Sequence, residues 1–593
     1  MKKLIAVLLV LVLAAGCAGC SKKQETDPAA QTPAAAETSA APASPEIHTS
    51  GSYEYVIQAD GTAAVVRFTD FDYEGELMIP DTLDGIRVTA IEYDAFGYES
   101  PMPGVTNPNP FPIRWEIPVI TLENIDWESY EPDPDTVVSI PIKFLIEGAE
   151  NGDGTLITDP TYEPVPLETY EPFNNITGIT IPEGVTRIGE RAFGKCLHLS
   201  AITLPESLTD LESGAFANCK FREITIPDSV IRIGDNPFCS CYQLERIVLS
   251  PDHPALEFRD GMLFTKADKR LVCCLAGAAS GDCVIPEGTE IVGGSAFYSN
   301  ASLISVTIPE GVTRIDVAAF ASCESLTDVT MPGSLVSIGD YAFQGCSSLS
   351  RVILPENLVS IGSYAYGICR SLTAVSIPDS VKNIGDNPFD LCEKLEQIIL
   401  SPDHPYLKLR DGMLFSKADK RVVCGLNSSL SGNCVIPAET EIIGNYAFDS
   451  IIAITAVTLP DSLIRIGDHA FRECSLLTSI TIPEKVNEIG DYAFFGTGLK
   501  EITVPGNVKK IGRAAFYDCR SLSLVRILDG VCEIGEGAFY EDTSIEKIVI
   551  PASVTAIGEE GLSTHGSATV IVVPGSWAEQ YCKDNGINYS AAE

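Results

Sequence analysis

Apolar residues recur along this chain with a period of about 23 positions, and the segment 325–346 shows one period clearly. Leu326, Val329 and Met331 have the spacing of a strand that buries one face, because the last two alternate around a polar residue. Pro332 has no N–H to give to a ladder and therefore ends the strand. The pattern predicts one short strand in each period, with its polar side chains turned outward.

The second half of the period returns to the core from the opposite side. Leu335 and Ile338 are the next inward positions, and Gly339 permits the turn that follows them. Phe343 then enters the core, and Cys346 closes the unit. Such self-similarity predicts a stack of coils, each of which buries its apolar face against the next coil.

One aromatic column organises the array. Phe96 begins it, and from Phe193 onward its members lie 22, 23, a multiple of 23, or 59 residues apart; they are Phe193, Phe216, Phe238, Phe297, Phe320, Phe343, Phe389, Phe448, Phe471, Phe494, Phe516 and Phe539, with Tyr366 and Leu562 in the same register. Stacking of these rings is expected to stabilise each interface between coils. The predicted fold is a leucine-rich-repeat solenoid, mostly β, with a parallel ladder, short turns and about 18 coils, which fills residues 175–573.

Two longer coils break the period and are nearly identical to each other. The segments 250–264 and 401–415 share a Ser-Pro-Asp-His-Pro start and an Arg-Asp-Gly-Met-Leu-Phe end. Their Asp-Gly pairs predict hairpin turns at Asp260 and Asp411. The histidine that recurs in both segments is expected to be structural; its two copies are His253 and His404.

The first 50 residues are predicted to be an export signal and a tether rather than part of the fold. Residues 1–20 combine two lysines, an apolar run too short to span a bilayer, and small residues before a cysteine. This segment is similar to the lipobox of bacterial lipoproteins, with Cys17 as the lipid attachment site and Cys20 as the alternative. Residues 21–50 are rich in Ala, Pro, Thr and Ser and are expected to be a disordered tether.

Charge excludes one class of partner. The formal net charge is −41, and such a surface repels phosphate backbones and anionic lipid heads. We therefore expect no nucleic-acid binding, and membrane attachment only through the lipid anchor.

The chain carries no recognisable catalytic motif. Nine of its 19 cysteines stand three residues after a column aromatic, and a periodic cysteine of this kind is expected to be a small buried side chain; they are Cys196, Cys219, Cys241, Cys323, Cys346, Cys369, Cys392, Cys474 and Cys519. Stacked cysteines have poor geometry for a disulfide, although export to an oxidising compartment would allow a few pairs to form one. The Cys239/Cys241 and Cys273/Cys274 pairs lack zinc-site spacing, and Asn151–Thr155 is expected to be a turn rather than a calcium loop. No enzymatic activity, cofactor or metal is expected.

The units resemble the BspA-like leucine-rich repeats of bacterial surface proteins, whose signature runs L-x-x-I-x-I-P-x-x-V-x-x-I-G-x-x-A-F-x-x-C. The resemblance covers residues 51–589 apart from one insertion. It implies an N-terminal cap with the first repeat in residues 51–98 and a closing helix in residues 574–593, for which Ser576 is the expected N-cap. It also implies a surface-displayed binding module, often discussed as an adhesin, without implying one ligand.

Residues 99–174 depart from the repeat pattern. This acidic, Pro-rich insertion contains the aromatic residues Trp115 and Trp127. An insertion of this size in a regular array is expected to be a specificity element, and its aromatic residues make a glycan a possible ligand.

The outward residue of the strand is often threonine, and we take this position as the candidate contact surface, represented by Thr307, Thr330, Thr458 and Thr481. The alternative is plain β-propensity. A column of acids follows the strand-ending prolines and is either a solvated turn edge or an acidic ridge. The expected function is a lipid-anchored protein, displayed on the outer side of the bacterial membrane, that binds a host-matrix or cell-surface protein. The alternatives are a structural envelope spacer and a carbohydrate-binding module.

Overall fold

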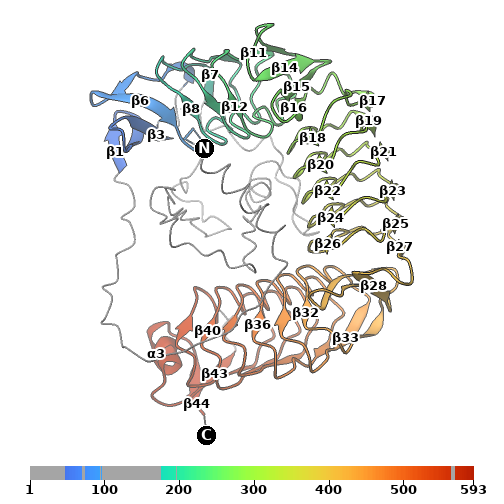
Figure 1. Cartoon of the computed structure of the whole chain (residues 1–593). Helices are drawn as coiled ribbons and strands as arrows, with labels where there is room; N and C mark the ends of the chain where they lie inside the picture. The colour runs from blue at the N-terminus through green and yellow to red at the C-terminus, as the bar shows by residue number, and fades with distance from the viewer. Residues whose placement is uncertain are drawn as a thin grey trace, which may run out of the picture. The chain divides into compact units, whose positions relative to one another are not determined.

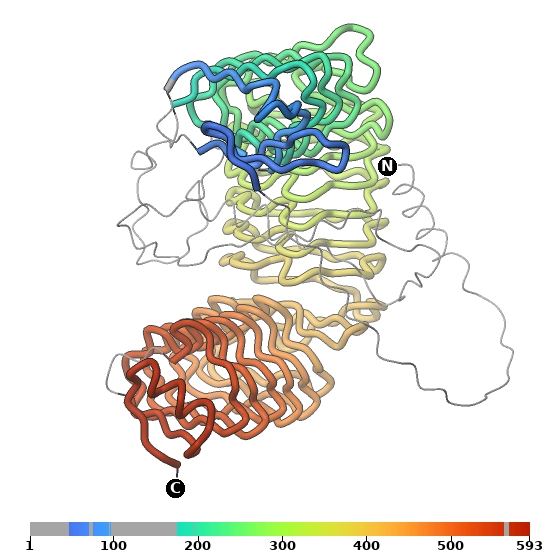
Figure 2. The backbone as a smooth tube through the Cα atoms, turned by 90° about the vertical axis from the view of Figure 1, so that its left-hand side faces the viewer, coloured from blue at the N-terminus to red at the C-terminus, as the bar shows by residue number. Residues whose placement is uncertain are grey.

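The computed structural model describes residues 47–69, 74–93, 95–96, 175–194, 196–562 and 568–592. The described chain winds into a β-solenoid of about 19 turns that lie about 23 residues apart, with almost no helix. Successive coils stack with their strands side by side, as the run from β18 to β26 shows in Figure 1 and the backbone tube shows in Figure 2. This confirms the predicted fold class.

Each coil contributes two short strands, whereas the sequence predicted one. In the coil analysed above, Val329 lies in β21 (Asp328–Thr330), and Ile338 lies in β22 (Ser337–Ile338). The strands of neighbouring coils are parallel and in register, so that Val306 is paired with Val329 and Ile315 with Ile338. The solenoid therefore has two parallel ladders, one on each side of the core.

The first ladder contains the longer strands, β4 (Glu74–Met78), β7 (Asn175–Thr180), β9 (Ala201–Thr203), β11 (Glu223–Thr225), β13 (Arg246–Val248), β17 (Gly281–Val284), β19 (Leu303–Thr307), β21, β23 (Arg351–Ile353), β25 (Ala374–Ser376), β27 (Gln397–Ile399), β31 (Gly432–Val435), β33 (Ile454–Thr458), β35 (Ser479–Ile480), β37 (Glu501–Val504), β39 (Leu524–Ile527), β41 (Lys547–Ile550) and β43 (Thr569–Val572). The second ladder contains β6 (Ile86–Ile91), β8 (Arg187–Ile188), β10 (Asp210–Leu211), β12 (Arg232–Ile233), β18 (Ile291–Val292), β20 (Arg314–Ile315), β22, β24 (Ser360–Ile361), β26 (Asn383–Ile384), β32 (Ile442–Ile443), β34 (Arg465–Ile466), β36 (Glu488–Ile489), β38 (Lys510–Ile511), β40 (Glu533–Ile534) and β42 (Ala556–Ile557).

The aromatic column lies inside the solenoid, as predicted. Phe297 and Phe320 stack with ring centroids 4.8 Å apart, and Phe320 and Phe343 stack at 5.1 Å with only 3° between their planes. The column begins one ring earlier than the sequence indicated, because Phe68 stacks on Phe96 at 5.2 Å. Each coil thus adds one ring to a buried stack, which is the main repeated contact between coils.

The periodic cysteines are buried and are also hydrogen-bond donors. Cys346 Sγ lies 3.2 Å from the carbonyl oxygen of Phe320, and Cys369 Sγ lies 3.2 Å from that of Phe343, in each case in the preceding coil. The same contact to the preceding column aromatic recurs at Cys219, Cys241, Cys323, Cys392, Cys474 and Cys519. All cysteines of the described residues are free thiols. Where this position is cysteine, its thiol therefore fills a small buried space and also satisfies a buried carbonyl group of the preceding coil.

The N-terminal cap is a small antiparallel sheet formed by β1 (Ile47–Ser50), β2 (Tyr53–Ile57) and β3 (Ala63–Phe68). Strand β3 then pairs in parallel with β6, and β5 (Thr82–Leu83) forms a hairpin with β6. This cap covers the open end of the second ladder. It also corrects one boundary, since residues 47–50, which composition assigned to the tether, are paired in β1.

Each of the two longer coils contains a three-stranded antiparallel meander. The strands are β14 (Leu256–Arg259), β15 (Met262–Thr265) and β16 (Arg270–Cys274) in the first, and β28 (Leu407–Arg410), β29 (Met413–Ser416) and β30 (Arg421–Gly425) in the second. The predicted hairpin turns are confirmed, because Asp260 and Gly261 both have positive φ, as a type I′ turn requires.

The meanders divide the hydrophobic core into three clusters. Leu263 packs with the cluster before the first meander, whereas its neighbour Phe264 packs with the cluster after it. Leu414 and Phe415 divide the second and third clusters in the same way. Successive strand residues point to opposite faces, so each meander is a partition that is buried on both sides.

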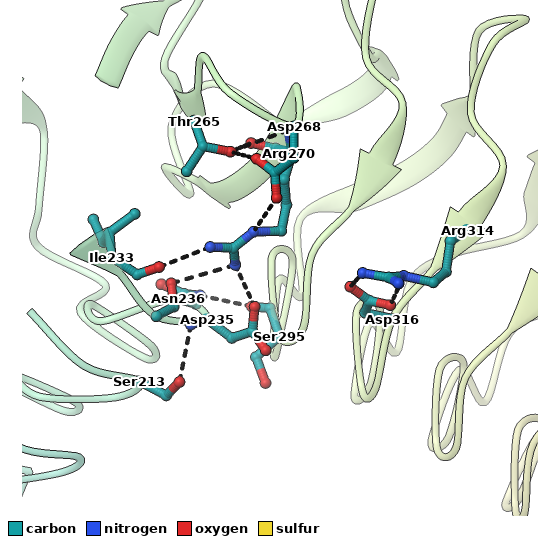
Figure 3. Close-up of polar contacts among 11 residues, drawn as sticks. Ser213, Ile233, Asp235, Asn236, Thr265, Asp268, Arg270, Ser295, Arg314 and Asp316 are labelled. Carbon is teal, nitrogen blue, oxygen red and sulfur yellow. Dashed lines mark hydrogen bonds and ion pairs between the residues drawn. The ribbon is translucent and has the colours of Figure 1, made fainter. Parts of the chain in front are cut away.

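Polar contacts join the coils across each meander. Figure 3 shows that the Arg270 guanidinium lies between the carbonyl oxygen of Ile233, 2.7 Å away, and the carboxylate of Asp235, while Asn236 Nδ2 donates to Ser295 O at 2.6 Å. The second meander repeats these contacts. Arg421 donates to Ile384 O and pairs with Asp386, and Asn387 donates to Tyr446 O.

The recurring histidines are structural, as predicted. His253 is fully buried, and its Nδ1 accepts a hydrogen bond from the Leu256 amide at 3.1 Å. Nε2 therefore carries the proton and donates to Pro227 O at 3.1 Å. His404 makes the same pair of contacts with Leu407 and Pro378.

The C-terminal cap contains the predicted helix, α3 (Trp577–Asp584). Ser576 is its N-cap, because Ser576 Oγ accepts a hydrogen bond from the Glu579 amide at 3.2 Å. The cap also contains β44 (Tyr589–Ala591), which the sequence did not indicate and which extends the first ladder by pairing in parallel with β43.

Candidate binding surfaces

The outward side chains of the first ladder form a column that crosses the coils, which we name the strand-face column. Between the two meanders, parallel register aligns Val284 with Thr307 and Thr307 with Thr330. The next three strands continue with Ile353, Ser376 and Ile399. After the second meander, the column resumes with Val435, Thr458 and Thr481. The four threonines predicted as contact residues thus share one face of the repeat.

The strand-face column is more apolar than the sequence indicated. Thr307 and Thr330 are exposed as expected, but Val284, Ile353 and Ile399 are 68%, 63% and 50% exposed. Val435, which precedes Thr458 in the column, is 57% exposed. A strip of branched apolar side chains mixed with hydroxyl groups can bury hydrocarbon and still form hydrogen bonds with a partner.

A polar column runs beside it, two residues earlier on each strand. Ser305 Oγ donates to Asp282 Oδ1 at 2.7 Å, and Asp328 follows in the next strand. Ion pairs join neighbouring coils in this column elsewhere, as between Arg246 and Glu223 at 2.8 Å. The apolar strip is therefore bordered by charges, which is the usual arrangement of a protein interface with a polar rim.

The acids that follow the strand-ending prolines are exposed, and several of them cap the turn of a neighbouring coil. Glu310 accepts hydrogen bonds from the amides of Gly333 and Ser334 in the next coil, and Glu183 accepts one from the Glu206 amide. Asp228 and Asp379 accept from the Ser250 and Ser401 hydroxyl groups. These contacts support the turn-edge interpretation of this column rather than that of a dedicated acidic ridge.

A second aromatic stack lies on the surface of the turns, and the sequence analysis missed it. We name it the aromatic ladder, and its members are Tyr341, Tyr364, Tyr446, His469, Tyr492, Phe495, Tyr517 and Tyr540. Consecutive ring centroids lie 4.3–6.0 Å apart, and every ring is partly exposed. Tyr364 meets Tyr446 across the second meander, so this stack continues where the buried column is interrupted.

The ladder has a sequence signal. Tyr341, Tyr364, Tyr446 and Tyr492 each stand two residues before a column aromatic, in the motif Tyr-Ala-Phe or Tyr-Ala-Tyr, and His469 has the same place in His-Ala-Phe. All five have positive φ, the left-handed conformation that turns the side chain away from the buried ring. A second register, one residue after the column, supplies the remaining rings at Phe495, Tyr517 and Tyr540.

Two buried cysteines of the described residues, Cys323 and Cys424, are held in the thiol form. Burial raises the pKa of the Cys323 and Cys424 thiols to about 12, so both remain protonated, whereas nucleophilic and zinc-bound cysteines are thiolates. Within the described ranges, no cluster of three or more His, Cys, Asp or Glu side chains has metal-binding geometry. In the same residues, no helix has the length and apolar character needed to cross a membrane.

Some predicted sites lie outside the described residues. These are the lipid attachment candidates Cys17 and Cys20, the aromatic residues Trp115 and Trp127, and the turn at Asn151–Thr155.

Residues 165–259, 280–408 and 441–567 match six copies of the BspA type leucine rich repeat region, and together these ranges cover more than half of the chain. The chain belongs to the BspA-type leucine-rich repeat family. The two gaps in the match contain β15–β16 and β29–β30, so the family pattern stops where the meanders replace the regular coil. The repeat family and the solenoid fold are typical of proteins without catalytic activity and are consistent with a protein-binding repeat protein.

Solved structures of other repeat proteins resemble the chain. A leucine rich cell surface protein from Faecalibacterium prausnitzii is 23% identical, with 61% of this chain and 96% of that chain covered and a TM-score of 0.35. The pneumococcal vaccine antigen PcpA is 17% identical, with 92% and 99% covered and a TM-score of 0.35. A leucine-rich repeat protein from Eubacterium ventriosum is 19% identical, with 54% and 85% covered and a TM-score of 0.37. No curated protein matches the chain.

Proposed function

We propose that this BspA-type protein is exported, anchored by lipid on the outer side of the bacterial membrane, and binds another protein through the strand-face column. The expected partner is a host-matrix or cell-surface protein. The observation that carries the proposal is the row of exposed branched side chains at Val284, Ile353, Ile399 and Val435. Branched apolar side chains that alternate with hydroxyl groups along one face can bury hydrocarbon against a partner and still form hydrogen bonds with it.

The stacked coils support this use of the face. Parallel register repeats the same outward position once per coil, so a partner meets several equivalent contacts in a row. Many weak contacts on a rigid surface favour binding, because the protein loses little conformational freedom on association. A structural spacer has no need for exposed apolar side chains, and this observation favours a binding protein over the spacer.

Export and anchoring are supported by the N-terminal sequence. The lysines, the short apolar run and the small residues before Cys17 have the order of a lipoprotein signal. Metabolic labelling with a fatty acid tests this part. Label is expected on the full chain and on Cys20→Ala, and it should be lost from Cys17→Ala; the reverse result would place the lipid on Cys20.

Binding is tested by screening the full chain against an array of matrix proteins and glycans. For each protein that binds, the substitution pair Ile353→Lys/Ile399→Lys should weaken binding at least tenfold, since it places two charges in the apolar strip. The matched control is Ile231→Lys/Ile464→Lys, because both residues are exposed isoleucines next to second-ladder strands and off the strand face.

Four results would contradict the proposal. Equal binding by the two pairs would remove the site from the strand-face column. Loss of binding only when residues 100–173 are deleted would place the site in the insertion. Binding to glycans alone would make the protein a carbohydrate-binding module, and binding to nothing on the array would favour the spacer.

A further inference from the structure

We propose that the C-terminal part of the aromatic ladder docks an extended polypeptide segment rich in arginine and lysine. The residues that form this docking surface are Tyr492, Phe495, Tyr517 and Tyr540, with the carboxylates that surround the last two rings. The surface lies on the turns that follow the second ladder, whereas the strand-face column lies on the first ladder, so this inference goes beyond the function proposed above and does not depend on it.

The four rings form one uninterrupted surface. Tyr492 and Phe495 lie in the same turn with ring centroids 6.0 Å apart, and Phe495 stacks on Tyr517 of the next coil at 5.2 Å. Tyr517 meets Tyr540 of the following coil at 5.4 Å. All four side chains are partly exposed, so the stack reaches the surface along three consecutive coils. The column aromatics of the same coils, by contrast, are fully buried.

The ladder already contacts guanidinium groups where this chain supplies them. Arg472 Cζ lies 5.7 Å from the centroid of the Tyr446 ring, and Arg513 Cζ lies 5.6 Å from that of Tyr492. Both distances are in the range of a cation–π interaction. Arg472 also forms an ion pair with Asp449 at 2.7 Å, so its cation is held between a ring face and a carboxylate. This pair of contacts shows which ligand group the ladder suits.

Carboxylates gather around the last two rings in the same way. Glu541 is a neighbour of Tyr540 in sequence, and Glu560 follows in the next coil; Asp518, beside Tyr517, already forms an ion pair with Arg520 at 2.6 Å. The negative charge of Glu560 is the largest cause of the raised pKa of Tyr540, followed by burial and by Glu541. Glu559 and Glu560 are exposed. The rings therefore lie in a negative potential that a bound cation would relieve.

Charge decides between the possible partners. An anionic polymer is repelled both here and by the net charge of −41. A neutral sugar could stack on the rings but would gain nothing from the carboxylates. Arginine and lysine side chains gain from both the rings and the carboxylates. Successive residues on one face of an extended strand are about 6.8 Å apart, which is close enough to the ring spacing for several of them to bind together. A basic polypeptide is the partner that uses the whole surface.

The test measures binding of a fluorescent nona-arginine peptide to the full chain by anisotropy. Tyr540→Leu keeps the bulk of the side chain but removes the π face, and it should weaken binding about threefold, as expected for one cation–π contact. Glu559→Gln/Glu560→Gln should weaken it at least fivefold. The control Asp461→Asn/Glu484→Gln removes the same charge from two exposed acids of the turn edge and should leave binding unchanged. Circular dichroism checks that every variant is folded.

Three results would overturn the inference. If the control pair weakens binding as much as Glu559→Gln/Glu560→Gln, the peptide responds only to net charge. If neither site variant changes binding, the peptide binds elsewhere on the chain. If Tyr540→Leu loses binding of a neutral oligosaccharide while peptide binding is unchanged, the ladder is a sugar-binding surface.

Discussion

Asp542 occupies a position where the repeat uses cysteine, and we predict that replacing it stabilises the protein. It stands three residues after Phe539, and its side chain is 1% exposed. The Cys519 amide donates to Asp542 Oδ1 at 2.6 Å, whereas Oδ2 is buried without a hydrogen-bond partner. In most of the other coils this position carries a thiol, which donates to the carbonyl of the preceding column aromatic in examples such as Cys369 and Cys474. A protonated carboxyl can donate in the same way, but a carboxylate cannot.

The magnitude follows from the pKa of this carboxyl. This pKa is raised from 3.8 to about 9, chiefly by burial; the nearby acids Asp518 and Glu541 add to the rise, and the hydrogen bond from the Cys519 amide opposes it. A raised pKa means that the folded state keeps the proton while the unfolded state loses it above pH 3.8, so stability is complete at low pH and falls as pH rises toward 9. At about 1.4 kcal/mol for each pH unit, the loss between pH 4 and pH 7 is about 4 kcal/mol.

Asp542→Asn removes this titration and keeps both hydrogen-bonding groups, because its Oδ1 accepts and its Nδ2 donates. We expect the free energy of unfolding at pH 7 to rise by about 3 kcal/mol and to change little at pH 4. Urea unfolding followed by circular dichroism at several pH values measures the difference. Asp529→Asn, which changes an exposed acid in the same coil, is the control and should have no effect at either pH. A gain that does not depend on pH, or a loss at pH 7, would refute the assignment of a proton to Asp542.

Two further predictions concern strain and acid sensitivity. Ile368 has a φ of +57°, whereas glycine occupies the same turn position at Gly345 and Gly496. Ile368→Gly should therefore raise the free energy of unfolding, measured by urea titration, by about 1 kcal/mol. Ile368→Ala keeps the strained backbone and should not raise it. Burial lowers the pKa of His253, so the contribution of this histidine to stability is complete above its unfolded-state pKa of 6.5 and is lost as pH falls. Between about pH 7 and pH 5, the free energy of unfolding should therefore fall less in His253→Gln than in the unaltered chain. An equal fall in both proteins would exclude this histidine as a cause of acid sensitivity.

Features that recur at a fixed spacing were the ones that the sequence could predict. The ring column, the buried histidines and the Asp-Gly turns each appear at fixed spacing, and each has one physical interpretation. The second ladder was missed because strands such as β22 contain two residues, too few to show an alternating pattern. The donor role of the cysteines was missed because the accepting carbonyl lies 26 residues earlier in the chain. The contacts of Arg270 and Asn236 depend on neighbours that only the folded meander brings together.

The exposed surfaces were even harder to predict from the sequence than the buried contacts. The sequence indicated that Thr330 points outward, but the apolar character of its face depends on Ile353 and Ile399, whose place in the same column is set by register. The aromatic ladder mixes two sequence positions, since Tyr492 precedes the column ring and Phe495 follows it. A pattern search at one position finds only part of such a surface.

The meanders explain how the array keeps its register while its core is divided. Ring stacking stops at Phe238 and resumes at Phe297, so the largest repeated contact between coils is absent there. Arg270 and Asn236 replace it with hydrogen bonds to carbonyl groups on the coils to either side, and Arg421 and Asn387 do so again. Directional contacts fix the position of the next coil even though they bury less apolar surface. Because stability in a solenoid depends on contacts between neighbouring coils, the three core clusters are expected to unfold as separate units, with the meanders as their boundaries.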